Sequence, residues 1–172
     1  MQGYVSGLAL LPDGHTLVAN LLLGQAIVFV DTATGTETAT LTLGLDYPYD
    51  LVLSPDGTKA YVSLWAGHAV QVVDVATRTL GARIMVGKNP EGLALSPDGA
   101  TLAVADADTD ELSLIDLASE SVVETVPLHP AGAPNNASPT HLAFDGADRL
   151  YVVSANENAV DVFTRTPGHA FT

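Results

Sequence analysis

Short apolar runs, each ending at turn residues, recur along the whole chain. The stretch 89–129 shows this pattern most clearly, with apolar runs at 91–96, 101–105, 111–116 and 121–128. Gly, Pro, Asp or Ser ends each run before a helix could complete three turns, and runs of this length are typical of strands. The pattern therefore predicts β-strands throughout the chain.

The residues between these runs predict antiparallel hairpins. In Ser96-Pro97-Asp98-Gly99, Pro sets φ for the second position of a type I turn, and Gly takes the left-handed position that rejoins the strands. Asp116 opens another hairpin turn, where its carboxylate can accept the backbone N–H two residues on. We therefore expect the stretch 89–129 to form a four-stranded antiparallel meander.

Both faces of this sheet must be covered, because 102–105 and 114–115 place apolar groups on each side. Sheets that are flanked by copies of themselves and arranged around an axis form a β-propeller. The turn glycines Gly14, Gly57 and Gly99 are 43 and 42 residues apart, and a period of about 40–45 is typical of propeller blades. We expect an all-β β-propeller built of four-stranded antiparallel blades, in one domain over 1–172. Its four repeats cover 3–44, 45–87, 88–129 and 130–166.

The fourth repeat departs from the pattern. An insertion rich in Pro, Gly and Asn at 130–139 precedes its first strand, and no convincing fourth strand follows Thr164. Met1 and Gln2 are too short to supply the missing strand. The last blade is therefore predicted to be incomplete, with an apolar face and an unpaired edge that favour association. We expect this chain to be part of a larger propeller or to complete one with a second copy, with a closed four-bladed ring as the alternative.

Composition limits the classes of partner. The 172 residues are 47% hydrophobic and 15% charged, which is ample for a packed core. The formal charge of −14 argues against nucleic acid and anionic membranes as partners, because both are bound by Lys and Arg clusters. No apolar segment approaches the roughly 20 residues needed to span a bilayer. The chain has no cysteine, which excludes disulfides and thiolate metal sites, and its start carries no signal-peptide pattern.

The repeat also resembles a known family. The pattern P-x-x-L-A-L-S-P-D-G, then a strand of the type L-Y-V-A-N and then V-x-V-I-D-x-A-T, is similar to the YVTN or YncE-like β-propeller repeat over essentially the whole chain. The matching residues are Pro48, Tyr61, Val62, Val73, Asp74, Pro90, 93–99, Ile115, Asp116, Pro139, Tyr151, Val152 and Asn158. The segments 47–51 and 134–137 look most like the propeller half of bifunctional proteins with a phosphatase domain downstream.

This resemblance implies a bacterial or archaeal protein outside the cytoplasm, periplasmic or secreted, whose propeller recognises or scaffolds a partner. The family usually has about seven blades, whereas four repeats are present here. Similar propellers also occur in lactone hydrolases and other enzymes, so the fold leaves the chemistry open.

Two sets of residues are candidate ligand sites. Asp106, Asp108 and Asp110 alternate like the carboxylates of a calcium loop, but Glu111 and Leu117 stand where an EF-hand loop has Gly and Glu, which favours a solvated hairpin turn over a metal site. Asp50, Glu91 and His141 follow the repeat prolines at the start of the innermost strands. They are predicted to converge at the channel mouth and hold a metal or a polar ligand, with exposure to water as the alternative.

A third set is apolar. Leu21, Leu22, Leu23 and Trp65 occupy equivalent hairpin turns of neighbouring blades, where polar residues are expected. They indicate a contact surface for another protein or another copy, with burial under a neighbouring loop as the alternative.

We therefore expect a non-enzymatic binding or scaffolding propeller. The alternative is a fragment of a propeller enzyme, either phosphatase-linked or a lactonase-like hydrolase with a channel-mouth site. No organic cofactor is expected, and a divalent cation is the one inorganic ligand that the sequence leaves open.

Overall fold

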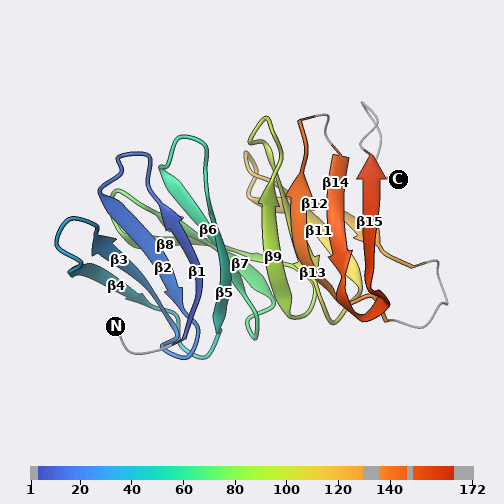
Figure 1. Ribbon diagram of the computed structural model, residues 1–172, viewed down its shortest axis with the longest axis horizontal. Coiled ribbons are helices and arrows are strands. Elements are labelled where there is room, and N and C mark those ends of the chain that lie inside the picture. Colours follow the sequence, from blue (N-terminus) through green and yellow to red (C-terminus); the bar gives the residue numbers. More distant parts are fainter. Residues whose placement is uncertain (1–3, 130–135, 147–148, 165–172) are drawn as a thin grey trace.

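The computed structural model describes residues 4–129, 136–146 and 149–164, and within them it contains antiparallel sheets that lie side by side (Figure 1). We name these sheets blades 1 to 4 in chain order. Blade 1 contains β1 (Val5–Leu10), β2 (Thr16–Leu21), β3 (Ala26–Asp31) and β4 (Glu37–Thr42). Blade 2 contains β5 (Pro48–Leu53), β6 (Lys59–Leu64), β7 (Ala69–Asp74) and β8 (Thr79–Met85).

Blades 3 and 4 repeat the same up-and-down order. Blade 3 contains β9 (Pro90–Leu95), β10 (Thr101–Asp106), β11 (Glu111–Asp116) and β12 (Ser121–Pro127). Blade 4 is three-stranded in the described part of the chain, with β13 (Pro139–Phe144), β14 (Arg149–Ser154) and β15 (Ala159–Thr164). The predicted fold class, an all-β propeller of antiparallel blades, is confirmed, and the last blade has three strands within the described residues. The regions that follow Thr164 and most of the predicted insertion at 130–139 lie outside the described residues.

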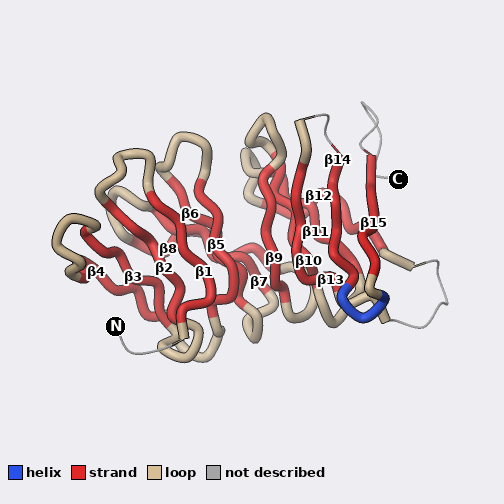
Figure 2. The backbone as a smooth tube through the Cα atoms, viewed as in Figure 1, coloured by secondary structure: helices blue, strands red, loops and turns tan. Residues whose placement is uncertain are grey.

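The tube drawing in Figure 2 shows strands joined by short turns. The helical element described is a single 3₁₀ turn, η1 (Ala155–Glu157), between β14 and β15. Within the described residues, no helix has both the length and the apolar character needed to cross a membrane.

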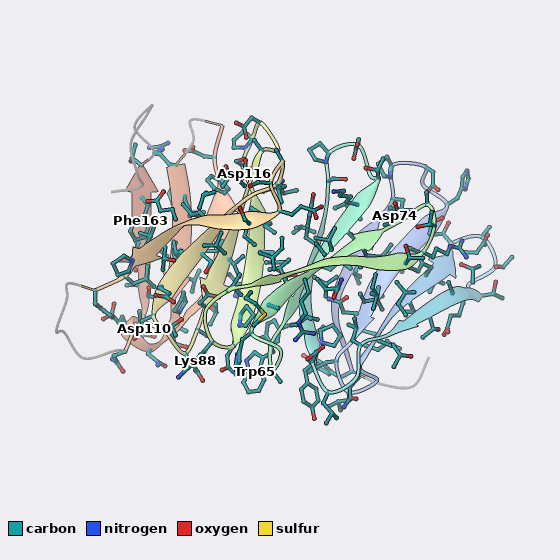
Figure 3. All side chains as sticks on the ribbon, turned by 180° about the vertical axis from the view of Figure 1, so that it is seen from behind. Trp65, Asp74, Lys88, Asp110, Asp116 and Phe163 are labelled. Carbon is teal, nitrogen blue, oxygen red and sulfur yellow. The ribbon has the colours of Figure 1, made fainter. Side chains whose placement is uncertain are left out.

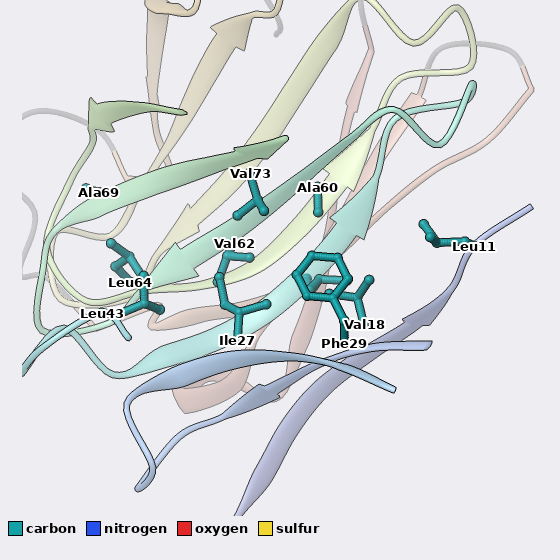
Figure 4. Close-up of a cluster of buried hydrophobic side chains, with 11 residues drawn as sticks. Leu11, Val18, Ile27, Phe29, Leu43, Ala60, Val62, Leu64, Ala69 and Val73 are labelled. Atoms are coloured by element: carbon teal, nitrogen blue, oxygen red, sulfur yellow. The ribbon is translucent and has the colours of Figure 1, made fainter. Parts of the chain in front are cut away.

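Apolar side chains fill the spaces between consecutive blades. Between blades 1 and 2, Val18, Ile27 and Phe29 pack against Val62 and Val73, and each is 0% exposed (Figure 4). Comparable clusters join blade 2 to blade 3 and blade 3 to blade 4. Because burial of one such side chain contributes about 1.5–3 kcal/mol, these layers are the main attraction between blades.

The first turns of blades 1, 2 and 3 also pack on one another. Gly57 and Gly99 have φ of +70° and +69°, the left-handed conformation that the sequence predicted. A Cβ atom on Gly57 would lie 2.6 Å from Cδ of Pro12, and one on Gly99 would lie 2.7 Å from Cγ of Pro55. These glycines therefore permit both the turn and the close approach of the preceding blade.

The turn aspartates differ from the prediction in one detail. The carboxylate of Asp116 accepts the backbone N–H of Ser119, three residues on rather than two, at 2.8 Å. Asp74 accepts the corresponding N–H of Thr77 at 2.7 Å. The pKa of the Asp74 carboxyl is lowered chiefly by the hydrogen bond from the Thr77 N–H. The pKa of the Asp116 carboxyl is lowered most by a hydrogen bond from the Ser119 hydroxyl and next by the Ser119 N–H.

The innermost strands lie next to one another, because β1 contacts β5, β5 contacts β9 and β9 contacts β13. Trp65, Lys88 and Asp110 lie along one rim of the molecule, whereas Asp74 and Asp116 lie toward the opposite rim (Figure 3). We call the first of these the Trp65 rim. It carries the turns between the second and third strands of each blade and the connections from one blade to the next.

Candidate functional site

An apolar pocket of about 400 Å³ opens on the Trp65 rim where blade 1 meets blade 2. Its lining residues are Leu22, Leu23, Tyr47, Tyr49 and Trp65. Leu22 and Leu23 come from the β2–β3 turn, and Trp65 comes from the β6–β7 turn. Tyr47 ends the connection into β5, and Tyr49 is the second residue of β5. Three segments distant in sequence therefore form one hydrophobic site.

Backbone hydrogen bonds hold these segments in place. The Trp65 N–H donates to the Tyr47 carbonyl at 2.9 Å, and the Leu22 N–H donates to the Tyr4 carbonyl at 2.8 Å. Tyr47 has φ of 51°, a conformation uncommon for an aromatic residue, immediately before Pro48. The pocket is therefore formed by fixed turns, and its side chains stay accessible, with Leu23 67% and Trp65 38% exposed.

The predicted contact residues divide between this pocket and the core. Leu22, Leu23 and Trp65 line the pocket together. Leu21 is 6% exposed and packs with Val28 on the face of blade 1 that is turned away from blade 2. The sequence reasoning missed Tyr47 and Tyr49, whose signal was their position on either side of the repeat proline.

Glu91 lies beside this pocket, at the start of β9. Burial raises the pKa of the Glu91 carboxyl, and a hydrogen bond from Trp65, the charge of His141 and a hydrogen bond from Tyr49 oppose this effect. The pKa of the Tyr49 phenol is also raised, first by burial and then by Glu91. Two aromatic residues of the pocket thus contact one half-buried carboxyl group.

The Asp50 carboxylate, predicted at the channel mouth, accepts backbone hydrogen bonds from two blades. Its Oδ2 accepts the Leu93 N–H of the next blade at 2.9 Å, and its Oδ1 accepts the Leu51 N–H at 2.8 Å. The Asp50 N–H donates to the Ser63 hydroxyl, and that hydroxyl donates to the Glu91 carbonyl at 2.6 Å. The Asp50 carboxylate therefore links blades 2 and 3 through backbone groups.

His141 is exposed, and its Nδ1 lies 3.2 Å from the Thr140 hydroxyl. The backbone here approaches β9 closely, because a Cβ atom on Gly92 would lie 2.9 Å from Cα of His141. Of the three residues predicted at the channel mouth, Glu91 and His141 interact electrostatically, whereas Asp50 is engaged by backbone N–H groups.

At the equivalent junction between blades 2 and 3, backbone N–H groups of the connection donate hydrogen bonds to side chains of the neighbouring turns. The Asn89 N–H donates to Nδ1 of His68 at 3.2 Å, and the Lys88 N–H donates to the Thr109 hydroxyl at 3.3 Å. These hydrogen bonds attach the connection between blades 2 and 3 to the β6–β7 and β10–β11 turns.

The junction between blades 3 and 4 contains the predicted acidic turn. Asp106 is 0% exposed, and burial raises its pKa to about 7, while the Ser113 hydroxyl donates to its Oδ2 at 2.6 Å. Asp108 and Asp110 instead line a separate cavity of about 180 Å³ with Ala107, Asn136, Ser138 and Asn156. Within the described residues no cluster of three or more His, Cys, Asp or Glu side chains is arranged to hold a metal.

Comparison with known proteins identifies the fold. No protein-family model and no curated protein matches the chain. A solved hydrazine synthase of Kuenenia stuttgartiensis superposes with a TM-score of 0.81 and 24% identity, over 93% of this chain and 46% of the other. Virginiamycin B lyase of Staphylococcus aureus superposes with a TM-score of 0.80 and 18% identity, over 98% of this chain and 54% of the lyase. The WD40 repeats of RRP9 superpose with a TM-score of 0.83 and 13% identity, over 100% of this chain and 51% of the RRP9 chain.

These similarities, all below 25% identity, show that the chain has a β-propeller fold. The chain spans about half the length of the solved structures it matches. The neighbours include both a lyase and a WD40 repeat protein, so the fold is compatible with either catalysis or binding.

Proposed function

We propose that this chain is a non-enzymatic binding or scaffolding module that forms part of a closed propeller and holds an apolar segment of a protein partner on the Trp65 rim. The observation that carries the proposal is the pocket lined by Leu22, Leu23, Tyr47, Tyr49 and Trp65. Exposed aromatic and leucine side chains grouped in a concave site are typical of protein contact surfaces. The repeat residues, such as Pro48, Tyr61 and Asp74, support a YVTN/YncE-like module that acts outside the cytoplasm.

The ends of the row of blades support completion by further blades. Val5, Leu8 and Leu10 of β1 are 42%, 62% and 53% exposed. They pair with Leu21, Ala19 and Leu17, so they share the face of blade 1 that is turned away from blade 2. At the other end, Val153, Val160 and Val162 are 39%, 60% and 51% exposed on blade 4. Apolar faces of this kind need a cover, and another blade fits them in shape and chemistry.

The sole tryptophan of the chain, Trp65, provides the test. Peptides are first selected from a displayed random library for binding to the intact chain. Each selected peptide is then titrated into the chain while Trp65 fluorescence is recorded. We expect peptides rich in Leu, Phe and Trp, a shift of Trp65 emission to shorter wavelength, and binding weakened about tenfold by Leu23→Ser.

Met85→Ser is the matched control, because Met85 is also exposed, at 61%, but does not line the pocket. It should leave the affinity unchanged. Equal binding by wild type and Leu23→Ser would refute a role for this pocket.

One observation favours an enzyme as the second candidate. Glu91, whose pKa is raised by burial, interacts with His141 near the innermost strands, and a raised carboxyl pKa suits a general acid. A screen for phosphatase and lactonase activity tests this candidate. Turnover that His141→Ala abolishes, in a chain that still folds, would replace the binding proposal with a hydrolase.

A further inference from the structure

The cavity between blades 3 and 4 is lined by oxygen-bearing side chains. It occupies the same place on the rim as the apolar pocket between blades 1 and 2, because both are formed by two hairpin turns and the connection between their blades. Five of its six lining residues carry a side-chain oxygen, namely Asp108, Asp110, Asn136, Ser138 and Asn156. Two of these five residues are aspartates, so the junction is both polar and acidic.

Asp110 has a buried carboxylate oxygen without a hydrogen-bond partner among the described residues. Asp110 is 7% exposed, and its Oδ1 accepts the Ser138 N–H at 2.8 Å. Its Oδ2 is buried and has no hydrogen-bond partner among the described residues. None of the ion pairs between described residues involves Asp108 or Asp110. A buried carboxylate oxygen without a partner destabilises the fold, and a bound cation removes that cost.

Backbone hydrogen bonds fix the segments that surround the cavity. The Asp108 N–H donates to the Lys88 carbonyl at 3.2 Å, and the Leu128 N–H donates to the Asp110 carbonyl at 3.0 Å. The Asn156 N–H donates to the Ala137 carbonyl at 3.1 Å. The oxygen groups are therefore carried by backbone that is already ordered, which lowers the entropy cost of binding an ion.

The donor set selects the class of ion. Carboxylate, amide and hydroxyl oxygens are hard ligands, and neither imidazole nor sulfur lines the cavity. Calcium accepts six to eight such oxygens in irregular geometry, whereas magnesium demands near-ideal octahedral geometry and retains its water. A cavity of about 180 Å³ accommodates an ion together with a few water molecules, each of which occupies about 30 Å³.

We propose that this cavity binds a calcium ion, with Asp110 and Asp108 as the charged ligands and Asn136, Ser138 and Asn156 as neutral ones. The ion would link the β10–β11 turn of blade 3 to two segments of blade 4, namely the residues just before β13 and the β14–β15 turn. This proposal changes the ligand set expected from the sequence, because Asp106 contacts Ser113 and does not line the cavity. It is independent of the proposed function, which concerns a different junction.

Isothermal titration with CaCl₂ tests the proposal on the intact chain, after removal of metal with EDTA and in 150 mM KCl to suppress diffuse binding to the acidic surface. We expect one site per chain, a rise in the melting temperature with Ca²⁺, and Mg²⁺ binding at least about tenfold weaker. Asp110→Asn should weaken Ca²⁺ binding more than about tenfold, because it removes one charge while an amide oxygen can still accept the Ser138 N–H.

Asp13→Asn is the charge-matched control, because Asp13 is an exposed acidic residue in a turn of blade 1 and should bind Ca²⁺ like wild type. Asn156→Ala is a second variant that removes a neutral ligand, so the test remains decisive even if Asp110→Asn fails to fold. The proposal is overturned if wild type gives no heat with Ca²⁺, if Asp110→Asn or Asn156→Ala binds like wild type, or if Mg²⁺ binds equally well.

Discussion

Three aspartates near the Trp65 rim show how immediate neighbours decide what a residue does. Asp50 accepts two backbone N–H groups, so its carboxylate serves as a link between blades. Asp106 receives the Ser113 hydroxyl inside the sheet, where its Oδ1 is buried without a partner among the described residues. Asp110 accepts one N–H and directs the rest of its carboxylate to a cavity. The same side chain therefore links two blades, is buried within one sheet or lines a cavity, according to its surroundings.

Asp106 should make stability depend on pH. Its pKa is about 7 in the folded chain against 3.8 for the unfolded reference, so between pH 4 and pH 7 the unfolded state loses the proton first. Stability should therefore fall as pH rises through this window. Asp106→Asn, which stays neutral, should be more stable than wild type by about 2–4 kcal/mol at pH 8 and close to it at pH 4.

Urea unfolding of both chains at several pH values, in the presence of EDTA, measures this difference. A difference in unfolding free energy that is constant from pH 4 to pH 8 would show that Asp106 is ionised in the fold.

At the scale of elements, the repeated turns set both the hairpins and the spacing of the blades. Ser54 and Ser96 occupy equivalent turn positions, and the hydroxyl of each donates to the aspartate two residues on at 2.6 Å. The same side-chain hydrogen bond therefore stabilises the repeated Ser-Pro-Asp-Gly turn in both blades. The sequence could predict these turns because their geometry depends on local residue types.

Gly14 and Gly57 form a matched pair that separates the two tasks of the turn. Both have φ of +70°, but a Cβ atom would meet Pro12 at Gly57 and nothing within 4 Å at Gly14. Gly14→Ala should cost about 1–2 kcal/mol from backbone strain alone. Gly57→Ala should cost about 1–3 kcal/mol more, because the blades must separate to admit the methyl group.

Chemical denaturation of the two variants provides the comparison. Equal destabilisation would mean that the contact between Gly57 and Pro12 does not contribute to packing between the blades.

For the whole molecule, the decisive feature is the pair of apolar faces at the ends of the row. Blades 2 and 3 are covered on both sides by buried side chains from their neighbours. Blades 1 and 4 have a neighbour on one side, and they lie at opposite ends of the row (Figure 1). Completion of the ring would remove the exposed valines of β15 and the exposed residues of β1 from water.

We therefore expect the chain to self-associate, with a light-scattering mass of at least twice that of one chain. Val160→Glu combined with Val162→Lys, on the end face of blade 4, should shift it to a monomer because charges oppose burial of that face. Val123→Glu is the control, because Val123 is 63% exposed on β12 of an inner blade. A compact wild-type monomer that does not associate would contradict this expectation.

The sequence alone determined the strands, the turns and the blade period. These follow from local patterns, such as apolar runs of strand length and the φ preference of Gly99, that act over a few residues. It also singled out Leu22, Leu23 and Trp65 as apolar residues in turns, because an unexpected residue type is visible without any contact.

Only the tertiary structure decided which side chains share a site. Tyr49 joins Trp65 and Glu91, Asp110 meets Ser138, and Asp50 reaches Leu93, because folding brings the turns of consecutive blades together. Residues far apart in the sequence, such as Asp50 and Leu93 at a separation of 43 positions, become neighbours through the stacking of sheets. Small differences in those neighbours then decide whether an aspartate accepts backbone hydrogen bonds, keeps its proton because its pKa is raised, or lines a cavity.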